Sequence, residues 1–88
     1  MHAPFPNLSA GQVAVAYTEQ ATGITLSLDG RWNKDPASSP YHIFPTEEEA
    51  LQAAESFVQR HPKAEAWLWD ANQKNLHRIT RREHGEGA

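Results

Sequence analysis

The clearest pattern of apolar and polar positions covers residues 46–61 and predicts an amphipathic helix. Thr46 can accept a hydrogen bond from the backbone N–H of Glu49. The Glu49 side chain can return a bond to the Thr46 N–H, which completes a capping box. Pro62 ends the pattern because proline cannot continue a helix. The positions expected to face the core recur at helical spacing and are Ala50, Leu51, Ala54, Phe57 and Val58.

Glu47, Glu48 and Glu49 at the start of this helix have two interpretations. An acidic cluster can bind a metal ion or a basic partner. Negative charge in the first turn also complements the positive end of the helix dipole. We favour the second interpretation, which assigns the triplet to the scaffold.

Alternation of apolar and small or polar residues predicts strands on both sides of the helix. Residues 13–18 alternate in this way, but a helix from Ser9 is the rival interpretation, with Gln12 completing a capping box and Gly23 ending it. The β-branched and aromatic content of residues 13–18 favours the strand. The other predicted strands cover residues 24–28, 41–44, 64–69 and 76–80.

The predicted order of elements is strand, strand, short strand, helix, strand, strand. This order is typical of the α+β class, with an antiparallel sheet packed by one main helix over residues 46–61. An Asp29-Gly30 turn follows the second strand. We expect residues 1–12 to form an irregular N-terminal arm, residues 13–80 a single domain, and residues 81–88 a disordered tail.

The last two strands allow their register to be predicted. An even turn places Trp69 opposite Leu76 and Trp67 opposite Arg78, where a cation–π contact is possible. A turn of odd length would shift this register by one residue. One face of the hairpin then holds Glu65, Trp67, Trp69, Leu76, Arg78 and Thr80, and the other holds Ala66, Leu68, His77 and Ile79. The second face is small and apolar and suits contact with the helix.

The tryptophan face of the hairpin has two interpretations. Large aromatic side chains in a small domain usually belong to the core, which would bury Trp67 and Trp69 under the N-terminal arm or on the helix side. An exposed aromatic patch beside Arg78 would instead be a surface for a partner. Trp32 and Arg31 lie in a polar loop, where a binding role and a lid over the sheet are both open.

Composition narrows the classes of function. The chain has 88 residues, no cysteine and a net charge of −3, and its mean hydropathy is −0.70. We expect a protein without disulfides, membrane spans or a signal peptide, in keeping with the cytoplasm. The negative net charge argues against bulk electrostatic binding to nucleic acid. The positive charge is nevertheless clustered in one segment, at Lys74, Arg78, Arg81 and Arg82.

The second half of the chain resembles a family of small bacterial domains of unknown function. The resemblance rests on Phe44-Pro45-Thr46-Glu47-Glu48-Glu49-Ala50-Leu51, on Trp67-Leu68-Trp69-Asp70 and on Leu76-His77-Arg78-Ile79, and it covers residues 41–80. It implies a strand, a capped helix and a closing hairpin. The chain departs from the family in the hairpin turn, where Asp70-Ala71-Asn72-Gln73 replaces the expected Asp-Gly. The resemblance implies no catalytic residue.

The titratable residues form no pattern typical of a catalytic or metal site. No histidine pair has the spacing of zinc ligands on a helix, and no Gly-x-Ser-x-Gly elbow or glycine-rich phosphate loop is present. Asp70-Ala71-Asn72 lacks the glycine and the distal glutamate of a calcium loop. We therefore expect a protein that is not an enzyme and holds no metal and no cofactor.

The sequence leaves three hypotheses for function. The leading one is a small protein-interaction or regulatory module, whose candidate binding residues are Trp67, Trp69, Arg78, Trp32 and Arg31. The alternative is a protein that binds single-stranded nucleic acid by tryptophan stacking together with Lys74, Arg78, Arg81 and Arg82. The third is a homodimeric structural protein, joined through the tryptophan face or an edge strand.

Overall fold

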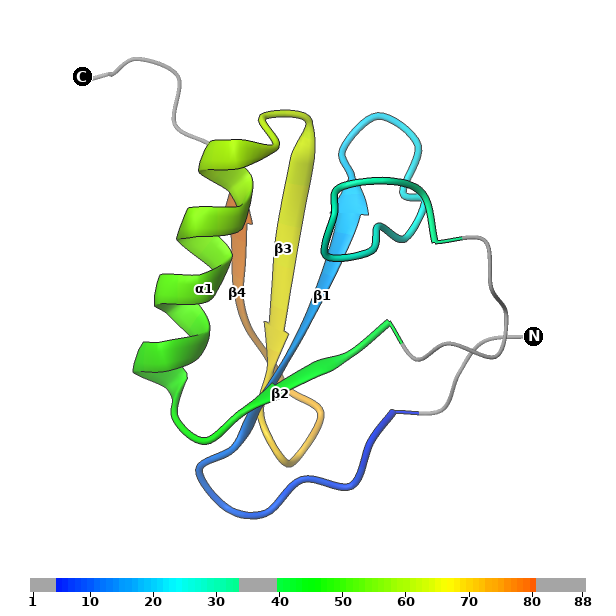
Figure 1. The fold of residues 1–88 in the computed structure, drawn as a ribbon. Coiled ribbons are helices and arrows are strands. Elements are labelled where there is room, and N and C mark those ends of the chain that lie inside the picture. The colour runs from blue at the N-terminus through cyan, green and yellow to red at the C-terminus, as the bar shows by residue number, and fades with distance from the viewer. Residues whose placement is uncertain (1–4, 34–39, 81–88) are drawn as a thin grey trace.

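The described strands form one antiparallel sheet in the order β2-β1-β3-β4 (Figure 1). The structure is a computed structural model that describes residues 5–33 and 40–80 of the 88. Within these ranges one helix lies along one side of the sheet (Figure 1). The elements in chain order are β1 (Val13–Glu19), β2 (His42–Phe44), α1 (Glu47–Arg60), β3 (Ala64–Trp69) and β4 (Asn75–Thr80). The predicted α+β class is confirmed.

Strand β1 occupies the centre of the sheet because its side chains can be buried on both faces. It pairs with β2 along one edge and with β3 along the other. Residues 13–17 are all buried, with Val13, Val15 and Tyr17 in the core cluster under the helix. The strand interpretation of residues 13–18 is therefore confirmed, and the rival helix from Ser9 is wrong.

Helix α1 begins and ends where its capping signals predict. The Thr46 hydroxyl accepts a hydrogen bond from the Glu49 N–H at 3.2 Å. The return bond from the Glu49 side chain is not among the hydrogen bonds of the described residues. At the other end, the His61 N–H bonds to the Phe57 carbonyl, and the helix stops before Pro62. The buried helix residues are Ala50, Ala54, Phe57 and Val58.

The core between α1 and the sheet is centred on two aromatic rings. Phe57 stacks on Tyr17 with ring centroids 3.7 Å apart and an interplanar angle of 11°. Small residues at Ala64 and Ala66 on β3 let the helix approach the sheet closely, while Leu68 fills the far end. The burial of Tyr17 raises the pKa of its hydroxyl, and the nearby charge of Arg60 acts in the opposite direction.

The strand predicted over residues 24–28 is wrong. Only two isolated bridges form there, Thr18 to Thr25 and Leu26 to Trp32. The Ser27 N–H bonds to the Arg31 carbonyl, so the chain reverses before a strand can extend. Leu26 is buried in the core, whereas Leu28 is 62% exposed. The apolar alternation therefore reflects one anchoring residue rather than a half-buried strand.

The β3–β4 hairpin confirms most of the predicted register and corrects its beginning. Trp67 lies opposite Arg78, and the neighbouring pairs on both sides also match the prediction. The turn has an odd length: the Asp70 N–H bonds to the Lys74 carbonyl, and Gln73 adopts a positive φ of 63°. A β-bulge beside Trp69 absorbs the shift.

The bulge changes the positions of two side chains. Trp69 pairs with Asn75 rather than with Leu76, so that predicted pair is wrong. Leu76 packs against the core cluster on the helix side instead of joining the tryptophan face. The remaining members of the tryptophan face keep their predicted side.

Two regions at the ends of the chain bear on the predicted organisation. Residues 5–12 contain neither helix nor strand, in keeping with an irregular arm. The tail predicted over residues 81–88 lies outside the described part of the chain. No helix within residues 5–33 and 40–80 is long and apolar enough to cross a lipid bilayer.

Gly30 permits the loop of residues 27–31 to approach the end of α1. Its φ is +84°, and a Cβ atom at this position would collide with the His61 ring. Gly23 has a similar φ of +74°, but a Cβ atom there would meet nothing within 4 Å. Both glycines therefore need a positive φ, but only Gly30 lies in close contact with another residue.

We predict that Gly30→Ala destabilises the protein more than Gly23→Ala does. Both substitutions place a side chain in the left-handed region, at a cost of about 1 kcal/mol. Gly30→Ala also forces the His61 ring to move, which adds about 1 to 3 kcal/mol. Urea unfolding measures both values, and combining Gly30→Ala with His61→Ala should remove the added part. Equal destabilisation by the two single substitutions would contradict the close contact.

His42 supplies a prediction about pH. Its Nε2 atom is buried without a hydrogen-bond partner in the described structure, and burial lowers the pKa of the ring below 6.5. The unfolded chain therefore binds a proton more readily than the folded one, so the stabilising effect of neutral His42 is complete above the unfolded pKa and declines as the pH falls through 6.5.

We expect the free energy of unfolding to decline less between about pH 7 and pH 5 in His42→Phe than in the wild type. Phenylalanine keeps an aromatic ring against Tyr17, whose centroid lies 5.7 Å from that of His42. The remaining histidines are common to both proteins, so the difference between the two pH profiles isolates His42. Parallel profiles would show that its burial has no effect on protonation.

Candidate functional site

The face of the sheet opposite α1 is the candidate site, and the strand register defines it. Residues that pair directly in an antiparallel sheet point to the same side. One row across the strands runs through Ile43, Ala14 and Trp69, the next through Ala16, Trp67 and Arg78, and a third through Thr18, Glu65 and Thr80. We call these nine residues the open face.

Aromatic side chains gather around Trp69 on the open face. Phe5 from the N-terminal arm makes an edge contact with Trp69, with centroids 6.2 Å apart. Tyr41, which precedes β2, makes edge contacts with both Trp69 at 5.7 Å and Phe5 at 5.2 Å. Trp67 is nearly parallel to Trp69, at 14° and 6.4 Å. The N-terminal arm thus adds the Phe5 ring to the aromatic cluster of the open face.

A hydrogen-bonded network fixes the polar end of the open face. Glu65 is 5% exposed, and its two carboxylate oxygens have different partners. One oxygen accepts a bond from Arg78 Nε at 2.8 Å, and the other accepts a bond from the Thr18 hydroxyl at 3.2 Å. The Thr18 oxygen in turn accepts a bond from the Trp67 indole N–H at 3.1 Å. The guanidinium carbon of Arg78 lies 5.4 Å from the Trp67 ring centroid.

The sheet supports this arrangement with small residues beneath large ones. Ala14 is fully buried and Ala16 is 6% exposed, although α1 lies on the opposite face of the sheet. Their paired neighbours Trp69 and Trp67 are themselves only partly exposed. Each of the two interpretations of the tryptophans is therefore correct in part. The rings cover the small residues of β1, as core residues would, but part of each ring remains exposed to solvent.

The structure brings together only some of the predicted binding residues. Trp67, Trp69 and Arg78 lie on the open face, in the order that the hairpin register predicts. Trp32 is 49% exposed and bridges Leu26, whose side chain lies on the helix side. Arg31 is exposed beside it, and the Arg31 N–H bonds to Asp29. Trp32 and Arg31 therefore form a separate surface.

Among the described residues, Arg78 is the one basic residue proposed for nucleic acid that lies beside an aromatic ring of the open face. Lys74 lies in the β3–β4 turn and is exposed. Arg78 is paired with Glu65. Arg81 and Arg82 lie outside the described residues.

Sequence reasoning missed several contributors to the open face. Ile43 is 48% exposed on this face, and the short strand that carries it gave no signal about which side it would face. Tyr41 was assigned to a strand but not to an aromatic cluster. Thr18 and Glu65 are 47 residues apart in the chain, so their hydrogen bond depends on a strand pairing that local patterns do not predict. Phe5 joins the arm to the aromatic cluster through its contacts with Tyr41 and Trp69.

Within residues 5–33 and 40–80, no three histidine, cysteine, aspartate or glutamate side chains gather where they could hold a metal ion. The triplet of Glu47, Glu48 and Glu49 contributes one side chain to another element: Glu47 contacts His77 Nε2 on β4 at 2.6 Å. This contact ties the first turn of α1 to the sheet.

No protein-family model matches the chain, and comparisons with curated proteins and with solved structures gave no match either. The resemblance to small bacterial strand–helix–hairpin domains stays a prediction.

We predict that Thr18→Val destabilises the protein by about 1 to 3 kcal/mol, because it leaves the Trp67 indole N–H and one Glu65 oxygen without their partner. Thr25→Val is the matched control, since Thr25 pairs with Thr18 across the bridge but its hydroxyl takes part in none of these bonds. Urea unfolding gives both values, and the indole N–H resonance of Trp67 should shift in Thr18→Val alone. An equal effect of the two substitutions would rule out a structural role for the network.

Proposed function

We propose that the protein is a small interaction module that binds another protein through the open face. The observation that carries this proposal is the combination of partly exposed Trp67 and Trp69 with a buried glutamate that holds their surroundings in place. Tryptophan and arginine dominate binding energy at protein interfaces. Side chains that are already fixed lose less entropy on binding, which favours affinity.

The apolar part of the open face extends across the sheet to the opposite edge. Ile43 is exposed there, one strand away from Trp69 in the same row. An interface centred on this row would have a polar boundary at Arg78 and Thr80. Apolar centre and polar rim are the usual arrangement of a protein interface.

Binding of single-stranded nucleic acid is the weaker hypothesis. The stacked tryptophans favour it, because bases stack on aromatic rings. Arg78, however, is the single cation among the nine residues of the open face, and the chain as a whole carries −3. Phosphate recognition at this face would need cations that the described open face does not supply. A homodimer through the open face remains a variant of the leading proposal.

We predict that Ile43→Lys weakens binding at the open face and leaves the fold intact. A random peptide library displayed on phage supplies the ligands, selected against the wild-type protein. A lysine placed in an apolar interface should weaken the selected peptides at least about tenfold, which corresponds to 1.4 kcal/mol. Leu28→Lys is the matched control, because Leu28 is an exposed aliphatic side chain outside this face.

The location of binding is measured separately from its strength. Chemical-shift changes on adding a selected peptide should centre on the indole N–H groups of Trp67 and Trp69. Peptides that bind Ile43→Lys as tightly as the wild type, or that shift only residues on the helix side, would contradict the proposal. Sedimentation without peptide tests the dimer variant, since self-association lost in Ile43→Lys would identify a second copy as the partner.

A further inference from the structure

Strand β4 offers a second surface, because it lies at the edge of the sheet. Among the described strands it pairs with β3 alone, and its six residues run from Asn75 to Thr80. Alternate backbone N–H and C=O groups of such a strand point away from its neighbour and can pair with another chain. The bulge beside Trp69 disturbs only the first part of β4, so the outer edge of residues 77–80 remains regular.

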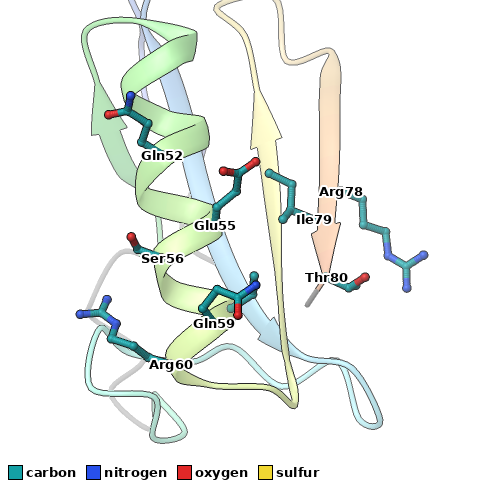
Figure 2. Close-up of a pocket in the computed structure, with 9 residues that line it drawn as sticks. Gln52, Glu55, Ser56, Gln59, Arg60, Arg78, Ile79 and Thr80 are labelled. Atoms are coloured by element: carbon teal, nitrogen blue, oxygen red, sulfur yellow. The ribbon is translucent and has the colours of Figure 1, made fainter. Parts of the chain in front are cut away.

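A groove lies between β4 and α1, directly beside this edge (Figure 2). Its volume is about 1190 Å³, and its walls are mostly polar on the helix and apolar at Val58 and Ile79. Figure 2 shows Glu55 pointing from α1 towards β4, Ile79 pointing from β4 towards α1, and Arg78 pointing away from the helix. A strand added to β4 would therefore place alternate side chains in the groove and beside Arg78.

The charge around β4 selects the kind of strand that fits. Residues 71–80 contain Lys74 and Arg78 and no acidic residue. Pairing of β4 with the β4 of a second copy would bring these charges together, which is unfavourable. The Arg78 side chain is 56% exposed, so its outer part can meet a carboxylate while Nε keeps its bond to Glu65. In the groove, the opposite charges of Glu55 and Arg60 on α1 offset each other, whereas Val58 and Ile79 favour apolar side chains.

We propose that the β4 edge binds an extended acidic segment of another protein as a fifth strand of the sheet. Acidic residues of this segment lie on the Arg78 side, and small apolar residues between them enter the groove towards Ile79. Strand addition of this kind combines main-chain hydrogen bonds with alternate side-chain pockets. The proposal goes beyond the open face and does not depend on it, because the main-chain bonds are made at the strand edge.

The probe is a short synthetic peptide that alternates glutamate with valine. We expect it to bind the full chain, to slow hydrogen exchange of the outward backbone amides of residues 77–80, and to lose affinity as salt rises. Two control peptides test the geometry: one with the same residues in separate blocks of glutamate and valine, and one N-methylated at alternate valines. Both should bind at least about tenfold more weakly, a difference of 1.4 kcal/mol. Equal binding of the N-methylated peptide, or unchanged exchange of residues 77–80, would overturn the proposal.

Charge reversal near the edge provides matched variants. Lys74→Glu and Arg31→Glu change the net charge equally, but only Lys74 adjoins β4, whereas Arg31 lies in the loop beyond β1. We expect Lys74→Glu to weaken binding of the alternating peptide about fivefold more than Arg31→Glu does. The difference is small because solvent partly screens exposed charges. Equal weakening by the two substitutions would show that only the net charge of the protein matters, which would overturn the edge site.

Two further measurements separate this proposal from the open face. Ile43→Lys should leave binding of the alternating peptide unchanged, because Ile43 lies on the opposite edge strand. Loss of binding in that variant would assign the peptide to the open face and overturn the β4 site. A dimer that protects the β4 amides without peptide would also overturn it, because a second copy would then occupy the edge.

Discussion

The width of the single described helix limits how much of the sheet it can cover, and the rest of the structure depends on this limit. A helix with its side chains is about 10 to 12 Å across, whereas four strands about 4.8 Å apart make a wider sheet. Helix α1 is fixed over the centre of the sheet by the stacking of Phe57 on Tyr17, at 3.7 Å between ring centroids. It covers one face incompletely and leaves a groove over β4. The opposite face must therefore be stabilised without a helix, by the side chains of the strands and by the N-terminal arm.

The open face meets this requirement with large rings over small residues. Trp67 and Trp69 lie in the same rows as Ala16 and Ala14, which are almost completely buried. Burial of Glu65 in such a place would be unfavourable without partners, because a desolvated carboxylate is costly. Arg78 and Thr18 supply those partners, and Thr18 passes the constraint on to the Trp67 indole. Stability and a preformed surface thus arise from the same contacts.

The parts of the structure that depend on neighbouring residues could be predicted from the sequence, and the parts that depend on distant ones could not. The Thr46 cap, the core face of α1 and the Trp67–Arg78 pairing follow from periodicities of 3.6 and 2 residues. The strand predicted over residues 24–28 failed because the chain reverses at Ser27. The register near Trp69 failed because Gln73, a residue other than glycine, adopts a positive φ that composition does not signal. The contributions of Ile43 and Tyr41 to the open face could not be predicted without knowing that β2 lies at the edge of the sheet next to β1.

Arg78 connects the two proposed surfaces and explains how both can use it. An arginine side chain has five N–H donors. Within the described residues, Arg78 makes one hydrogen bond, from Nε to Glu65, and its side chain remains 56% exposed. A carboxylate on an added strand can therefore approach the outer guanidinium without removing the partner of Glu65, so the Thr18–Trp67 bond need not break. A strand bound at the β4 edge would hold Arg78 more firmly against Trp67. It would thereby further fix the polar end of the open face. Because such coupling is reciprocal, a partner that fixes Trp67 should favour the added strand in turn.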